Sequence, residues 1–264
     1  MNREHRNLET RTVRGVVSAG HCIGCGTCVA MCPQDAVLLL LNERKGVYEA
    51  SVAASKCTLC GLCLRVCPAP ELGDSALPAG SAHPPSSAAL IGEYRACYLG
   101  HSTRDEVRHQ ASSGGIVTQL LLAALDAGLI DSALVTRMSQ NEPLRPEPFL
   151  ARTVSEIAEA ATSKYCPVPA NLALRQVLTT EARSVAVVGL PCHLRGVRLA
   201  MRHSPALARK VSYLVGIFCS HGDSTHGTEF VLRRSVGSPE GVESFSYRGD
   251  GWPGGISVLT RQGS

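Results

Sequence analysis

The stretch CIGCGTCVAMCP, residues 22–33, carries four cysteines at spacings of two, two and three residues and ends in a proline. The same pattern returns as CTLCGLCLRVCP at residues 57–68, where each cysteine lies 35 positions after its counterpart. A constant offset of this kind indicates an internal duplication. The proline after each run prevents a helix from continuing past the last cysteine. Three thiolates so close together in one loop can hold three corners of a single cluster, so the two runs predict a pair of iron–sulfur sites.

The spacing resembles that of bacterial two-cluster ferredoxins, in which the fourth cysteine of each run binds the cluster of the other run. On this resemblance, residues 1–70 form a ferredoxin-like α+β domain with two 4Fe-4S clusters, and residues 36–56 supply a strand and a turn between the runs. Zinc is the alternative, because CxxC pairs also bind zinc, but zinc explains neither the third cysteine nor the Cys-Pro ending of both copies. The expected ligands are Cys22, Cys25, Cys28 and Cys67 for one cluster and Cys57, Cys60, Cys63 and Cys32 for the other.

Composition limits the class of protein. A chain of 264 residues can bury a core without disulfides, so its twelve cysteines are expected to be metal ligands in a reducing compartment. The charged start, MNREHRNLETRTVRG, does not read as a secretory signal, and no apolar run is long enough to span a bilayer. A formal net charge of +4 is too small and too scattered to indicate nucleic-acid binding. We therefore expect a soluble, cytoplasmic protein.

Residues 71–90 are rich in proline, alanine and serine and lack apolar periodicity, which is typical of a linker. From residue 91 to residue 264, apolar strand-like runs alternate with helical patterns, as expected of an α/β domain. The patterns predict helices over 115–127, 155–162, 170–180, 193–203 and 223–236, and strands over 132–136, 184–188, 211–218 and 242–247.

Three loops of this domain lie at strand ends or helix starts, where α/β folds bind their ligands. The loop ASSGGIV places Ser112 and Ser113 as helix caps and Gly114 and Gly115 as exposed amides, a suitable seat for a phosphate or pyrophosphate. An ordinary helix cap is the alternative. The other two loops, GLPCHLRG and GIFCSHGDS, follow apolar strands and place one cysteine each at a strand-to-helix turn.

Those two cysteines, Cys192 and Cys219, would emerge at the same sheet edge if their strands are parallel. Cys166, in SKYCPVP, is a third candidate for that edge, and Cys97 or a histidine could supply a fourth ligand. Buried free cysteines are more often inert packing. Two alternatives therefore stay open: a third 4Fe-4S cluster close to a flavin, or unrelated thiols.

The second domain resembles the beta-subunit family of coenzyme F-420 hydrogenase and dehydrogenase, which also includes 7-hydroxymethyl chlorophyll a reductase. The resemblance rests on SSGGIVTQLLLAALDAGLIDSALV, on SKY and PVPANLALRQV on either side of Cys166, and on VAVVGLPCHLRGVR, LVGIFCSHG and SYRGDGWPGG, which run in this order from about residue 92 to the end. It implies that the domain binds FAD and that Cys192 and Cys219 help to bind a cluster there. The residues expected around FAD are Ser112, Ser113, Gly114, Gly115, Thr118 and Lys164.

The same resemblance implies an iron–sulfur flavoprotein oxidoreductase, or a subunit of one. It would pass electrons between a two-electron carrier, coenzyme F-420, and one-electron 4Fe-4S clusters through FAD. Its partners would be a redox protein or a hydrogenase or dehydrogenase subunit, besides the small-molecule carrier. Two alternatives remain: a ferredoxin-dependent reductase of another organic substrate, and a flavin-free electron-transfer or interaction subunit.

No catalytic residue is identified from the sequence, although His193 and His221 are candidates for proton delivery. The chain departs from the family pattern at His193, where glutamine is expected. It also ends soon after RGDGWPGG, earlier than family members usually do. We expect a naturally short or a truncated C-terminus, which leaves the substrate open.

Overall fold

The computed structural model describes residues 3–72, 94–249 and 251–261. Most of the linker expected over residues 71–90 lies outside these ranges, because only the end of the short helix α5 (Ala69–Leu72) falls inside them. None of the described helices is long and apolar enough to cross a membrane.

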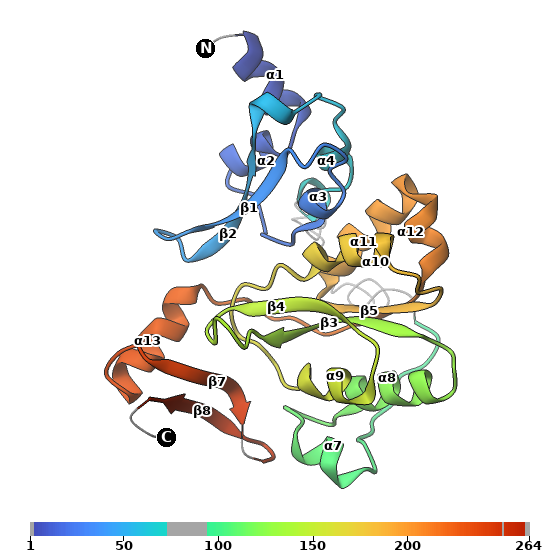
Figure 1. Ribbon diagram of the computed structural model, residues 1–264, viewed down its shortest axis with the longest axis vertical. Coiled ribbons are helices and arrows are strands. Elements are labelled where there is room, and N and C mark those ends of the chain that lie inside the picture. Colours follow the sequence, from blue (N-terminus) through green and yellow to red (C-terminus); the bar gives the residue numbers. More distant parts are fainter. Residues whose placement is uncertain (1–2, 73–93, 250, 262–264) are drawn as a thin grey trace, which may run out of the picture.

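The N-terminal part, residues 3–72, repeats one short helix in its two cysteine runs (Figure 1). Helices α3 (Thr27–Ala30) and α4 (Leu62–Arg65) occupy equivalent positions and pack against each other. Each follows a glycine with positive φ, Gly26 at 84° and Gly61 at 73°, a conformation that favours glycine. The duplication is therefore present in the backbone. The other elements are α1 (Arg3–Arg11), α2 (Arg14–Ser18), the antiparallel hairpin of β1 (Val37–Asn42) and β2 (Val47–Val52), and η1 (Ala54–Lys56).

A four-stranded sheet in the order β4-β3-β5-β6 is the centre of the second part. Three of its strands are parallel, and β4 pairs antiparallel with β3 at one edge. Parallel neighbours require crossover connections, which accounts for the alternation of strands and helices along the chain. The strands are β3 (Ser132–Met138), β4 (Pro146–Ala151), β5 (Val185–Gly189) and β6 (Val211–Gly216).

Helices cover both faces of this sheet (Figure 1). One face carries α8 (Ile116–Asp126) and α9 (Val154–Glu159). The other carries η2 (Ala170–Ala173), α10 (Leu174–Thr179), α11 (Pro191–His203) and α12 (Pro205–Lys210). The remaining elements are α7 (Asp105–His109), α13 (Thr225–Ser235) and the antiparallel hairpin of β7 (Val242–Gly249) and β8 (Gly255–Thr260).

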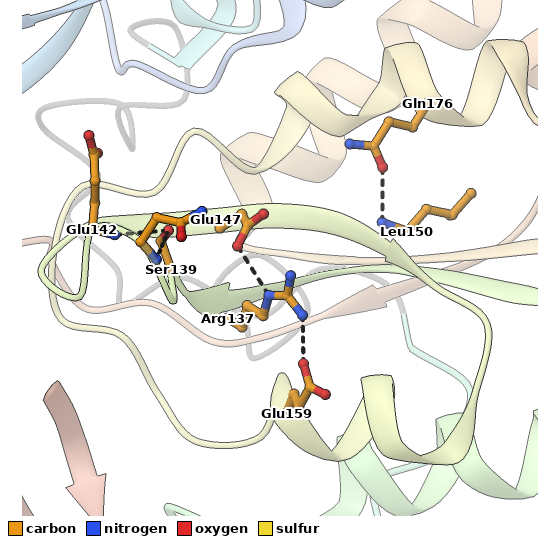
Figure 2. A network of polar contacts seen from close by, with 8 residues as sticks. Arg137, Ser139, Glu142, Glu147, Leu150, Glu159 and Gln176 are labelled. Carbon is orange, nitrogen blue, oxygen red and sulfur yellow. Dashed lines mark hydrogen bonds and ion pairs between the residues drawn. The ribbon is translucent and has the colours of Figure 1, made fainter. Parts of the chain in front are cut away.

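Polar side chains fasten the edge strand β4 to its neighbours, as Figure 2 shows. Arg137 on β3 pairs with Glu147 on β4 at 3.1 Å and with Glu159 on α9 at 2.6 Å. Gln176 on α10 accepts a hydrogen bond from the Leu150 backbone N–H at 3.2 Å. An edge strand leaves backbone groups without a strand partner, and Gln176 forms a hydrogen bond with one of them.

One hydrophobic cluster joins the two parts of the molecule. It contains Met31 and Val66 from the cysteine runs together with Leu174 from α10 and Val187 from β5. In Figure 1, α10 and α11 accordingly lie between the N-terminal part and the sheet. The opposite face of the sheet has its own cluster, which includes Leu121 of α8. The N-terminal part is thus packed on the helical layer through apolar side chains.

The helices and strands expected from the apolar patterns are all present, with shifted ends. The helix expected over 170–180 begins as the 3-10 turn η2, and the helix expected over 155–162 ends at Glu159. The patterns did not predict α7, β4, α12 and β8. Strand β4 was missed because Pro146 and Pro148 read as loop, yet an edge strand tolerates proline.

Candidate functional site

Three cysteines of the second run and one of the first surround a cavity. Cys57, Cys60 and Cys63 line it together with Cys32 of the first run. The cavity is small, with a volume of about 20 Å³. The structure therefore brings together the four residues expected to hold one cluster.

The other four cysteines also lie near one another. Burial first, and then the charges of Cys25, Cys67 and Cys22, raise the pKa of the Cys28 thiol. Burial likewise raises the pKa of Cys67 to about 11; a backbone hydrogen bond at Ala69 opposes this rise, and the charges of neighbouring thiols add to it. A thiolate in such surroundings is costly unless a positive metal centre neutralises it. Four buried or half-buried thiols in one place thus suit a metal cluster.

The spacing of these thiols bears on the zinc alternative. A zinc ion needs its sulfur ligands about 2.3 Å from one point. Among the described residues, no group of three or more histidine, cysteine or acidic side chains is close enough to hold a metal ion. The choice between zinc and clusters therefore rests on the third cysteine and the Cys-Pro ending of each run.

Strands β5 and β6 are parallel, as the common sheet edge for Cys192 and Cys219 requires. Cys192 lies in the first turn of α11, and Cys219 follows β6 in an exposed loop. Burial raises the pKa of Cys192, and the charges of Cys25 and Cys219 raise it further, so these three thiols are neighbours. Cys166 lies in a separate hydrophobic cluster with Tyr247. The structure thus brings two of the three thiols together, and the third 4Fe-4S cluster stays a prediction.

The loop before α8 differs from the expected helix cap. The N-cap residue is Gly115, at φ 73°, and no side chain caps the helix. Ser112 instead accepts a hydrogen bond from the Ser163 backbone N–H at 2.8 Å, and Arg108 donates to the Ser113 carbonyl at 3.3 Å. The expectation that the two serines cap α8 is therefore wrong. The helix keeps an uncapped positive end, which remains suitable for an anion.

The two glycines of this loop are required by packing. A Cβ atom added at Gly114 would lie 2.9 Å from the Gly100 carbonyl oxygen. One added at Gly115 would lie 3.2 Å from both the carbonyl oxygen and a methyl group of Val107. A bulky residue at Gly115 would therefore disturb the loop as well as any bound phosphate. Thr118 lies half-buried in the first turn of α8.

Lys164 turns toward the end of α9. Its Nζ atom donates to the carbonyls of Ala160 at 2.8 Å, Ala161 at 2.7 Å and Thr162 at 3.0 Å. Burial lowers the pKa of Lys164 to about 8, and the charge of Cys166 opposes this shift. Here Lys164 satisfies the last carbonyls of a helix. A role at FAD, which stays a prediction, would require the ammonium group to leave them.

The two histidine candidates differ in access. His193 is buried, and its Nδ1 accepts a hydrogen bond from the Leu190 N–H at 3.3 Å. Burial lowers the pKa of His193 to about 4, against a hydrogen bond with the Val168 backbone, so the ring is neutral near pH 7. His221 is exposed and contacts Ser220 at 3.0 Å. Of the two, His221 is the one whose ring is open to solvent.

A shallow depression beside α7 was not predicted from the sequence. Asp105, Arg108 and His109 of α7 line it with Gly251 and Trp252, and its volume is about 760 Å³. The Arg108 guanidinium lies 4.4 Å from the centre of the Trp252 ring, within the range of a cation–π contact. The sequence feature that could have indicated this depression is the single tryptophan of the chain, in RGDGWPGG.

Three family models match the chain. A 4Fe-4S dicluster domain matches residues 21–70. The N-terminal and C-terminal models of the coenzyme F-420 hydrogenase/dehydrogenase beta subunit match residues 97–175 and 182–264. The chain belongs to this beta-subunit family. The resemblance drawn from the sequence motifs is confirmed, and the N-terminal part is a 4Fe-4S dicluster domain.

Individual relatives agree with the family. The beta subunit of coenzyme F-420 hydrogenase from Methanothermobacter thermautotrophicus is 35% identical over 134 residues, 49% of this chain and 47% of that protein. Coenzyme F-420-dependent sulfite reductase from Methanocaldococcus jannaschii is 26% identical over 247 residues, 88% of this chain and 36% of that protein. The chloroplast 7-hydroxymethyl chlorophyll a reductase of Oryza sativa is 24% identical over 136 residues, 52% of this chain and 28% of that protein. This chain therefore spans half or less of the length of these curated relatives.

Proposed function

We propose that this chain is an oxidoreductase, or a subunit of one, that passes electrons between coenzyme F-420 and two 4Fe-4S clusters through FAD. The observation that carries the proposal is the gathering of eight cysteines into two groups, in a part packed directly on the beta-subunit domain. Family membership supports an oxidoreductase, and the relatives named for coenzyme F-420 support that carrier. A hydrogenase or dehydrogenase subunit is the proposed protein partner.

Each proposed ligand set draws three cysteines from one run and the fourth from the other. Neither cluster is then complete until both runs are folded. Apolar residues, among them Val13, Ala36 and Val37, pack around the sulfurs. This packing limits solvent access, and solvent access is one determinant of a cluster's reduction potential. The sets are Cys22, Cys25, Cys28 and Cys67, and Cys32, Cys57, Cys60 and Cys63.

The start of α8 is the proposed seat for the FAD phosphates. Its first amides have no side-chain cap, and Arg108 adds a positive charge beside Ser113. A bound flavin supplies the conversion between a hydride and single electrons. Cys192, whose neighbours include Cys25, lies in α11 at the boundary with the dicluster domain.

A second function is the reduction of another substrate with electrons supplied through the clusters. The relatives named coenzyme F-420-dependent sulfite reductase and 7-hydroxymethyl chlorophyll a reductase favour this alternative. A flavin-free electron-transfer subunit is the third candidate, and flavin content separates it from the other two.

An anaerobic titration of the full chain, loaded with iron, sulfide and FAD, tests the proposal. The protein should contain about eight iron atoms per chain. Reduced coenzyme F-420 should bleach the flavin and the iron–sulfur absorbance together. If only reduced ferredoxin bleaches them, the protein is a reductase of another substrate; if the chain takes up no flavin, it is an electron-transfer subunit.

A charge at Ser113 tests the phosphate seat without disturbing the packed glycines. Ser113 is exposed, so Ser113→Glu should fold, and a carboxylate near the start of α8 is favourable to the helix itself. It should nevertheless repel the FAD phosphates and weaken FAD binding about tenfold or more. Ser113→Gln is the matched control of similar size, and equal FAD affinity of the two variants would refute the seat.

A further inference from the structure

Asn171 lies fully buried where the dicluster domain meets α11. Its backbone N–H donates to the Cys25 carbonyl at 2.9 Å. Its side-chain Nδ2 donates to the His193 carbonyl at 2.9 Å and to Thr27 Oγ1 at 2.7 Å. A Cβ atom added at Gly196 would lie 2.9 Å from Nδ2, so α11 packs closely there. One side chain thus links the first cysteine run to the beta-subunit domain.

The direction of each hydrogen bond follows from this geometry. The His193 carbonyl can only accept, so the Asn171 atom that faces it must be the amide nitrogen. That nitrogen also donates to the Thr27 hydroxyl oxygen, which leaves the Thr27 proton free to be donated. The Cys25 sulfur lies 3.2 Å from Thr27 Oγ1. A thiolate that binds a cluster can only accept, so with Cys25 as a ligand the Thr27 hydroxyl is the donor of this contact.

Asn171 is held in this orientation at a cost. Its Oδ1 atom is buried and has no hydrogen-bond partner among the described residues. An unpaired buried oxygen destabilises a fold. The two bonds donated by Nδ2 are the compensating contacts, and they place the Thr27 hydroxyl.

The second cysteine run, which also lies within the described residues, lacks this arrangement. The duplication aligns Thr27 with Leu62, which has no hydroxyl, and Cys25 with Cys60. Cys25 is buried, whereas Cys60 is exposed. The two proposed clusters therefore differ in their surroundings although their ligand spacing is the same.

We propose that Thr27, positioned by Asn171, donates a hydrogen bond to the Cys25 sulfur and raises the reduction potential of the cluster that Cys25 and its three partner cysteines hold. The inference rests on the ligand assignment of the proposed function. Reduction adds negative charge to a cluster, and a donor at a ligand sulfur stabilises the reduced form. Because Asn171 belongs to the beta-subunit domain, docking of the two domains contributes to this potential.

A redox titration of the cluster-loaded full chain, followed by electron paramagnetic resonance, tests the inference. Thr27→Val removes the hydroxyl at similar volume and should disfavour reduction of one cluster by up to about tenfold, which is 59 mV for one electron. Thr27→Ser keeps a hydroxyl and should restore the potential. Thr103→Val, the same exchange at an exposed position outside both cysteine runs, is the control and should change neither potential.

The two proposals fail in different ways. If the unaltered chain shows no reducible 4Fe-4S signal, the ligand assignment fails. If both signals are present and Thr27→Val leaves both potentials unchanged, the hydrogen-bond inference is overturned. Should Thr27→Val not take up iron, Asn171→Ala decides, because it removes the positioning donor and a potential equal to that of the unaltered chain contradicts the inference. Independently of any variant, the reduced cluster must show a coupled proton that exchanges with deuterium, and its absence overturns the inference.

Discussion

Lys164 illustrates how much one side chain contributes at the end of a helix. Lys164→Met keeps the alkyl chain but removes the ammonium group that binds three carbonyls after α9. Hydrogen bonds from charged groups contribute about 1.5–3 kcal/mol, so we expect the free energy of unfolding to fall by about 2 kcal/mol. Urea denaturation of the full chain measures the change. Lys164→Arg, which keeps the charge, should lose less.

The same variant separates two roles for this residue. If Lys164 acts only at the helix end, Lys164→Met should bind FAD with unchanged affinity under conditions where it remains folded. A loss of FAD affinity with little change in stability would contradict the structural role, because it would mean that the ammonium group leaves the carbonyls for the flavin.

At the scale of an element, α9 begins with a capping box. Thr153 Oγ1 accepts a hydrogen bond from the Glu156 N–H at 3.2 Å, and the Glu156 carboxylate accepts from the N–H groups of Thr153 at 3.0 Å and Arg152 at 2.7 Å. The bond from Arg152, ahead of the other contacts, lowers the pKa of Glu156 below its usual 4.5. Thr153→Ala should therefore destabilise the fold by about 1 kcal/mol at neutral pH.

The lowered pKa of Glu156 gives this helix a pH dependence with a definite sign. A carboxyl with a lowered pKa in the folded state stabilises the fold above its unfolded pKa and loses that contribution as the pH falls below it. Thermal unfolding from pH 7 downward should show a smaller decline below about pH 4.5 in Glu156→Gln than in the unaltered chain. Glu181→Gln, on an exposed turn, is the control. Parallel curves for all three proteins would show that the cap has no linkage to pH.

Sequence patterns predict those helices and strands whose structure depends on residues close by in the chain. The apolar runs of β5 and β6 and the periodicity of α8 and α11 read directly as strands and helices. The start of α8 could not be read in this way. Two serines before a helix normally indicate a cap, but Ser112 binds the Ser163 N–H, 51 positions away. Gly115, which adopts positive φ without strain, becomes the N-cap instead.

At the scale of the whole molecule, contacts between residues far apart in the sequence also limit what can be predicted about the site. The resemblance of the cysteine spacing to that of two-cluster ferredoxins predicts that Cys32 shares a cavity with three cysteines of the second run. It cannot predict that Asn171 contacts Thr27, 144 positions away, because that contact depends on how the dicluster domain packs on α10 and α11. Met31 and Val66 likewise read as ordinary residues of a cysteine run, yet they lie in the core of the beta-subunit domain.

This shared core predicts that the dicluster domain and the sheet unfold together. Leu174 of α10 is fully buried in the cluster that also contains Met31 and Val66. Leu174→Ala should cost about 2–5 kcal/mol and lower the unfolding temperature by roughly 5 to 15 °C. Under anaerobic heating, the iron–sulfur absorbance and the far-ultraviolet circular dichroism should shift by the same amount, because loss of the core releases both cysteine runs. Leu129→Ala, at a half-exposed position, should shift neither. A variant in which the helical signal melts early while the cluster absorbance persists would mean that the two parts are separate folding units.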